Sequence, residues 1–172
     1  TLDRSSAASD VYKRQDADRC FIVDEKGEAV SPSTVCAMIA ERYLDENPGA
    51  TIIHNLITSK SVRELVETKG GKPVRTRVGH SFIKAQMAKE GAVFGGEHSA
   101  HYYFSDFFNA DSGMLAALHV LATLGGQDKP LSELKRAYET NRASGEINSE
   151  VADQAGRTEA CLLYTSDAAD ER

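Results

Sequence analysis

Short apolar runs alternate along the chain with longer segments in which apolar residues recur every three or four positions. The short runs are rich in β-branched residues, which predicts strands. We place these strands at residues 20–23, 29–30, 51–58, 73–78 and 92–94. The first two runs flank a turn signal at residues 24–27, which indicates a hairpin.

Four of the five longer segments end at glycine or at Asn-Pro-Gly, which is typical of helices. We place helices at residues 31–47, 62–69, 81–91, 111–124 and 131–138. Ser31 and Pro32 suit the cap and first turn of the first helix. Alternating strands and helices predict an α/β fold, with a mixed sheet layered by helices.

Composition narrows the class of protein. The 172 residues are 41% hydrophobic and carry a formal net charge of −6, which argues against a nucleic-acid partner. The chain has no run of about 18 apolar residues and no secretory signal pattern, so we expect no membrane partner. The three cysteines lack metal spacing and indicate reduced thiols in a cytoplasmic protein.

The two ends of the chain share an unusual relation. Residues 5–15 (SSAASDVYKRQ) and residues 161–171 (CLLYTSDAADE) are encoded by one DNA string and its reverse complement. That string resembles a transposase adapter used in sequencing libraries. We therefore expect residues 1–15 and 161–172 to be translated adapter, and we exclude them from the fold.

Two short motifs suggest a site for an anion or a metal. Asp16 and Asp18 stand two apart beside Arg19, so the carboxylates could chelate a hard cation while the arginine binds a phosphate. His80 follows Gly79 at a predicted strand-to-helix junction, where N–H groups favour anions. The structural alternatives are a solvated acidic loop for the first motif and a packing histidine for the second.

A third motif, GEHSAH at residues 96–101, places a carboxylate, a hydroxyl and an imidazole at alternate positions. If this stretch is extended, Glu97, Ser99 and His101 face the same side and can both donate and accept hydrogen bonds. Such a face suits the hydroxyls of a sugar ring. A Ser–His–carboxylate triad is disfavoured, because same-face residues of one strand cannot form its end-to-end relay. The structural alternative is a strand with a polar outer face.

Together the three motifs resemble the α-D-phosphohexomutase family, which contains phosphomannomutases and phosphoglucomutases. The family has a DGDxDR metal loop, a TGHS-like segment and a GExSGH sugar loop, in this order. The matching strings here are DADR at 16–19, VGHS at 78–81 and GEHSAH at 96–101. The resemblance implies an isomerase that moves a phosphoryl group between C1 and C6 of a hexose through a phosphoserine and a bisphosphorylated sugar.

The resemblance also implies roles for individual residues. Asp16 and Asp18 would bind Mg²⁺, and Arg19 and His80 would be catalytic. The hydroxyls of a phosphorylated mannose or glucose would be bound by Glu97, Ser99 and His101. Lys60 lies three residues after the family's usual basic position, and its role stays open, as do the preferred hexose and the oligomeric state.

The chain departs from the family pattern at several points. The first metal-loop aspartate would fall at Arg14, and Ala100 replaces the usual glycine of the sugar loop. The TASHNP-like catalytic-serine segment and the RxSxTEP-like phosphate loop are not in this sequence. We therefore expect an inactive fragment, with these parts: an adapter tail at 1–15, the end of domain 2 at 16–29, domain 3 at 30–144, a candidate start of domain 4 at 145–160, and an adapter tail at 161–172.

Two other functions remain open. One is a non-catalytic module that binds a sugar phosphate with the same residues. The other is a phosphoglucosamine mutase relative, which would share the chemistry and differ in its substrate.

Overall fold

The computed structural model describes residues 18–142 and 150–161. The chain divides into two compact units, Thr1–Asn141 and Arg142–Arg172, and each is described by itself. Asp16 and the N-terminal segment 1–15 lie outside the described residues, as does most of the segment 161–172. The domain boundaries expected from the sequence stay predictions.

A five-stranded mixed sheet forms the centre of the first unit, which confirms the predicted fold class. Its strands run in the order β4-β3-β5-β6-β7, and β3 lies parallel to both β4 and β5. The remaining neighbours pair antiparallel. The bounds are β3 Thr51–Asn55, β4 Lys72–Thr76, β5 Phe94–Gly96, β6 Tyr102–Phe104 and β7 Ala110–Asp111. The predicted hairpin is confirmed as β1 Ile22–Val23 paired with β2 Ala29–Val30.

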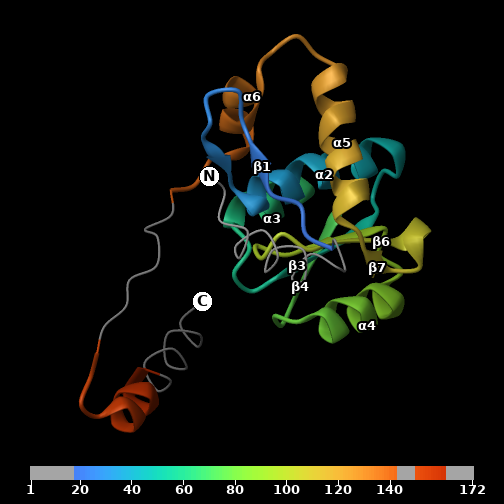
Figure 1. Cartoon of the computed structure of the whole chain (residues 1–172). Helices are drawn as coiled ribbons and strands as arrows, with labels where there is room; N and C mark the ends of the chain where they lie inside the picture. The colour runs from blue at the N-terminus through green and yellow to red at the C-terminus, as the bar shows by residue number, and fades with distance from the viewer. Residues whose placement is uncertain (1–17, 143–149, 162–172) are drawn as a thin grey trace, which may run out of the picture. The chain divides into compact units, whose positions relative to one another are not determined.

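Helices cover both faces of the sheet. Figure 1 shows α2 and α5 on one side of the strands and α4 on the other. The helices are α2 Pro32–Glu46, α3 Lys60–Thr68, α4 His80–Glu90, α5 Gly113–Gly125 and α6 Leu131–Tyr138, with a short 3-10 helix η1 at Ser105–Phe107. All five predicted helices are present. Pro32 is in the first turn of α2, but the Ser31 side chain makes no capping hydrogen bond.

Alternation along β3 sends successive side chains to two separate cores. Ile52 packs into the larger core with α2, α3 and α5. Ile53 points to the other face, where it packs with Ile83 and Met87 of α4. At the end of β3, His54 therefore points to the same face as Ile52, and Asn55 points to the same face as Ile53.

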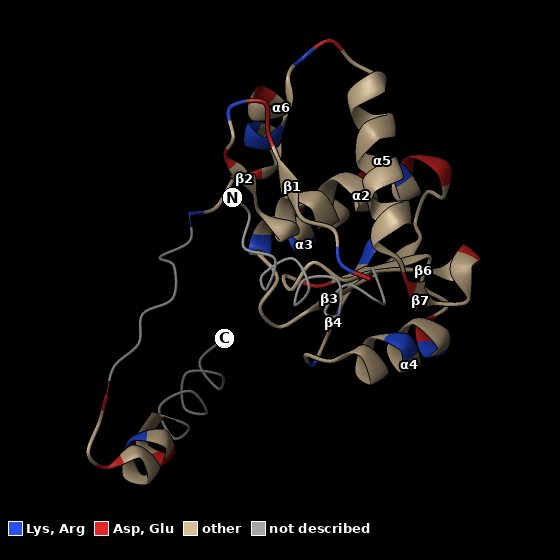
Figure 2. Ribbon diagram, in the orientation of Figure 1, with Lys and Arg blue, Asp and Glu red and all other residues tan. Residues whose placement is uncertain are grey.

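An ion pair ties the β1–β2 hairpin to α6. The Lys135 ammonium lies 2.8 Å from Asp24 Oδ2 and 3.1 Å from Glu28 Oε2. Figure 2 shows the acidic and basic residues of the hairpin beside the basic residues of α6. Asp24 Oδ1 also accepts hydrogen bonds from two backbone N–H groups of the turn, so this carboxylate organises the hairpin as well as its contact with α6.

Two predictions of extended structure are wrong, and two strands were not predicted. The predicted strand at 51–58 ends at Asn55, because Thr58 N–H turns back to the Asn55 carbonyl. The stretch 97–101 is a turn and not a strand: Glu97 N–H donates to His101 O at 3.0 Å, and Ala100 has φ = 67°. The segment 102–111, which was not predicted to pair, supplies β6 and β7.

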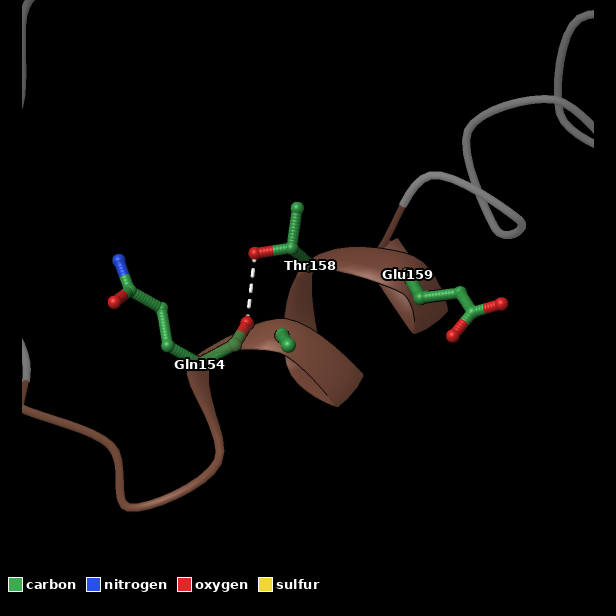
Figure 3. Close-up of a pocket in the computed structure, with 4 residues that line it drawn as sticks. Gln154, Thr158 and Glu159 are labelled. Carbon is green, nitrogen blue, oxygen red and sulfur yellow. Dashed lines mark hydrogen bonds between the residues drawn. The ribbon is translucent and has the colours of Figure 1, made fainter.

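The second unit is described over residues 150–161, where residues 154–161 form a helix. A hollow of about 580 Å³ lies against this helix, lined by Gln154, Thr158 and Glu159 together with Ala155 (Figure 3). Thr158 Oγ1 donates to the Gln154 carbonyl at 2.8 Å. All four lining residues come from one exposed helix, so the hollow holds no buried polar group. Within residues 18–142 and 150–161, no helix has the length and apolar content needed to cross a membrane.

Candidate functional site

The three parallel strands end at the same edge of the sheet, and polar residues follow each of them. Asn55 closes β3, Gly79 and His80 come shortly after β4, and Glu97 follows β5. Ligands bind at this edge in open α/β sheets, because side chains of several connections converge there. We call the residues that meet here the Glu97 cluster; it comprises Asp18, Arg19, Asn55, His80, Glu97, Ser99, His101, Tyr103 and Asp111.

Glu97 is the buried centre of this cluster, with 2% of its surface exposed. Its Oε1 accepts hydrogen bonds from Asn55 Nδ2 at 3.0 Å and from Gly79 N at 3.3 Å. Its Oε2 accepts from the Tyr103 hydroxyl at 2.8 Å. One carboxylate therefore holds together the ends of β3 and β4 and the neighbouring strand β6, which sets the position of the groups around it.

His101 connects the Glu97 turn to the segment before β1. Arg19 pairs with His101 in an isolated antiparallel bridge, and Arg19 Nε donates to His101 Nε2 at 3.1 Å. His101 Nδ1 lies 2.9 Å from Ser99 Oγ. Burial, and next the charge of His80, lower the pKa of His101, so the ring is neutral near pH 7. A neutral ring that accepts at Nε2 must carry its proton on Nδ1, which then donates to Ser99.

The Ser–His–carboxylate relay is not formed. Both Ser99 Oγ and Glu97 Oε2 approach the same nitrogen of His101, at 2.9 Å and 3.6 Å. A relay needs the hydroxyl and the carboxylate on opposite nitrogens of the ring. Asp18 Oδ2 lies 3.4 Å from the opposite nitrogen, Nε2, but Arg19 donates to Nε2 and the ring proton on Nδ1 faces Ser99. The ring therefore orients the Ser99 hydroxyl and cannot accept its proton.

Tyr103 links Glu97 to His80. Its hydroxyl donates to Glu97 and lies 2.9 Å from His80 Nδ1, which can donate to the same oxygen. Burial, together with the bond to Glu97, raises the pKa of Tyr103 far above its ordinary value, so the hydroxyl keeps its proton. The His80 side chain is 48% exposed, so its other nitrogen is available to a ligand.

Asp111 completes the group from β7. Burial alone would raise the pKa of Asp111, but Lys84 Nζ at 2.9 Å lowers it, and the carboxyl is ionised. Ligand atoms of Asp18, His80, His101 and Asp111 all lie within 4.8 Å of one another. These four residues could approach one cation, although Asp18 Oδ2 faces His101 Nε2 at 3.4 Å and Lys84 competes for Asp111.

The structure brings together six of the seven site residues predicted from the sequence. Asp18, Arg19, His80, Glu97, Ser99 and His101 all lie in the Glu97 cluster, and Asp16 lies outside the described residues. The roles assigned to these residues stay predictions. Direct contact of Glu97 with a sugar would have to compete with three donors that it already holds.

Sequence reasoning missed Asn55, Lys84, Tyr103 and Asp111. Asn55 had a usable signal, since it is a polar residue at the end of a buried parallel strand. The sequence suggests only packing for Tyr103 and only a charge at a helix start for Asp111, because their partners come from other segments.

Known proteins that are similar to this chain match most of its first compact unit. The family model described as phosphoglucomutase/phosphomannomutase, alpha/beta/alpha domain III, matches residues 31–141. A phosphomannomutase of Escherichia coli K12 is 46% identical over 138 residues, which are 80% of this chain and 30% of that protein. A phosphomannomutase of Methanocaldococcus jannaschii is 40% identical over 139 residues, 81% of this chain and 31% of that protein.

Solved structures agree with the sequence matches. A phosphoglucomutase/phosphomannomutase family protein from Burkholderia thailandensis superposes with a TM-score of 0.67 at 32% identity, covering 72% of this chain and 27% of that chain. A putative phosphomannomutase from Thermus thermophilus gives a TM-score of 0.67 at 25% identity, with 72% and 28% covered. The chain spans about 30% of the length of the two phosphomannomutases from Escherichia coli K12 and Methanocaldococcus jannaschii.

Proposed function

Because the chain belongs to the phosphoglucomutase/phosphomannomutase family, we propose that it supplies the sugar-binding domain of a hexose phosphate mutase. The proposed reaction moves a phosphoryl group between C1 and C6 of mannose or glucose through a phosphoserine and a bisphosphorylated sugar. The sequence contains no TASHNP-like serine segment, so the proposal includes no activity for the 172-residue chain alone.

One observation carries the proposal: residues 18–19, 79–80 and 97–101 meet in a single hydrogen-bonded cluster. A hexose that turns over between two half-reactions must be held in two orientations. Its hydroxyls then need partners that both donate and accept, which Ser99 and His80 offer. Arg19 is exposed and adds a cation suited to a phosphate.

The proposed cofactor is Mg²⁺, which prefers oxygen ligands. Within the described part of the cluster, Asp18 and Asp111 supply carboxylates, and the Asp18 side chain is 25% exposed and therefore reachable. Asp111 is held by Lys84, so we propose Asp18, together with Asp16, as the magnesium ligands. A magnesium ion there would offset negative charge on the phosphoryl group as it is transferred.

A domain exchange tests this function. Residues 31–141 of this chain would replace the matching segment of the Escherichia coli K12 phosphomannomutase, and turnover of mannose 1-phosphate would be measured. We expect an active chimera. In it, His101→Ala should lower kcat/KM about a hundredfold, because Ser99 loses the group that orients its hydroxyl. His98→Ala is the matched control, since His98 lies in the same turn but is exposed, and its side chain bonds only Ser33 Oγ among the residues that the structure describes.

The outcomes separate the alternatives. A folded chimera that binds mannose 1-phosphate without turning it over would favour the non-catalytic module. Preference for glucosamine phosphates over mannose and glucose phosphates would favour the phosphoglucosamine relative. Equal effects of His101→Ala and His98→Ala would remove the Glu97 cluster from the sugar site.

A further inference from the structure

A second polar hollow lies on the opposite face of the sheet from Glu97. It has a volume of about 530 Å³, within the range of small-molecule sites. Its walls come from β3, β4, α3 and the connection between β3 and α3; the residues that matter here are His54, Leu56, Lys60, Arg63, Pro73 and Arg75. His54 and Arg75 are register partners on neighbouring parallel strands, so their side chains emerge side by side on one face.

The two faces keep this hollow apart from the Glu97 cluster. Asn55 follows His54 in β3 and points the other way, where it donates to Glu97. Both sites lie near the carboxyl ends of β3 and β4, but a ligand in the hollow would contact the α3 face of the sheet, whereas the Glu97 cluster lies on the face that carries α4.

Positive charge dominates the hollow. Arg63 pairs with Glu67 at 2.8 Å and Lys60 approaches Glu64 at 3.6 Å. Arg75 forms no ion pair with a carboxylate within the described residues. At least one guanidinium is thus available to an anion, and planar guanidinium groups bind phosphate through two parallel hydrogen bonds.

His54 adds a hydrogen-bond acceptor to this positively charged hollow. It is 4% exposed, and its Nδ1 lies 3.2 Å from the Asn55 carbonyl, to which it donates. Burial, followed by the charges of Arg75 and Arg63, lowers the pKa of His54, so the ring is neutral. The neutral ring keeps a lone pair on Nε2, which has no partner among the described residues and can accept from a ligand hydroxyl.

We propose that this hollow is a second ligand site, which binds a small hydroxylated phosphate monoester. Arg75 and Lys60 bind the phosphate, His54 Nε2 accepts from a hydroxyl, and Leu56 and Pro73 contact the carbon chain. The site is separate from the proposed hexose site and does not depend on mutase activity.

The test uses the 172-residue chain labelled with ¹⁵N and titrated with glycerol 3-phosphate. We expect saturable amide shifts at residues 54–60 and at residues 74 and 75, and an affinity at least fivefold weaker in Arg75→Gln. Arg136→Gln removes an exposed charge on α6 and should leave the affinity unchanged. Glycerol alone and inorganic phosphate alone should each bind more weakly than the ester.

Each of the following outcomes would overturn the site: no saturable shift, equal weakening by both arginine variants, or inorganic phosphate binding as tightly as the ester. Equally tight binding of inorganic phosphate would mean that the hollow attracts any anion and that His54 accepts no hydrogen bond from a ligand hydroxyl. Shifts confined to residues 97–101 would also reject this site, while supporting the proposed function of the Glu97 cluster.

Discussion

Replacing Glu97 by leucine tests the structure of the cluster most directly. Leucine fills a similar volume but accepts no hydrogen bond. The substitution leaves three donors without their acceptor: Asn55 Nδ2, Gly79 N and the Tyr103 hydroxyl. Asn55 and Tyr103 are fully buried, so water cannot replace the lost oxygen atoms at these two positions.

The expected loss of stability follows from the number of hydrogen-bond donors that are left without an acceptor. Each buried donor left unsatisfied costs about 1–3 kcal/mol. Two fully buried donors and one partly buried donor therefore predict a loss of about 4 kcal/mol in the free energy of unfolding. Burying the leucine side chain returns about 1 kcal/mol. Glu97→Gln keeps one acceptor oxygen, and Tyr103 can then donate to His80 Nδ1, so a loss of about 2 kcal/mol is expected.

Urea unfolding of the 172-residue chain measures both losses. With a slope of about 2 kcal/mol per molar urea, Glu97→Leu should lower the midpoint by about 1.5 M. Glu46→Leu is the matched control at an exposed position of α2 and should change the free energy by less than about 0.5 kcal/mol. A loss below about 1 kcal/mol for Glu97→Leu, or a loss equal to that of the control, would refute the hydrogen-bonded cluster.

Three further measurements test other parts of the fold. Gly96→Ala should cost about 2 kcal/mol in urea unfolding, because the added Cβ would overlap Cys36 Sγ; failure of a Cys36→Ala background to restore stability would contradict this packing. Ser59→Ala should cost about 1 kcal/mol because its Oγ caps α3, whereas Ser31→Ala, which removes no such bond, should cost less; equal losses would be inconsistent with the caps described. Burial lowers the pKa of His119 below its ordinary value of 6.5, so as pH falls through that value the unfolded chain binds the proton first and stability drops. His119→Phe should reduce the slope of stability against pH between about pH 6.5 and 5, and an unchanged slope would exclude this cause.

Local patterns were sufficient for the helices and for the first hairpin. Period-3.6 apolar positions located α2 to α6, and glycines after the last turn marked the ends of α2 to α5, because both signals come from residues close together in the sequence. The paired strands β6 and β7 escaped prediction for the opposite reason. Tyr102–Phe104 is apolar on both faces, so it shows no alternation, and only its pairing with β5 defines it as a strand.

The three segments predicted to supply the candidate site meet in the structure, but the local geometry expected for residues 97–101 was wrong. An extended stretch was expected to align Glu97, Ser99 and His101 on one face. The structure instead folds residues 97–101 into a turn, closed by Glu97 N–H donating to the His101 carbonyl and by Ala100 at φ = 67°.

The turn has a consequence that strand alternation would not give. It points Glu97 inward to hold the ends of β3 and β4, while Ser99 and His101 stay at the edge and bond each other. A carboxylate satisfied by three donors is better suited to fixing its neighbours than to meeting a mobile ligand. Specificity for a sugar would then rest on the groups that Glu97 holds in place. Such a division between a carboxylate that anchors the site and the groups that it positions cannot be predicted from the spacing of residues, because it depends on which oxygen atoms already accept hydrogen bonds.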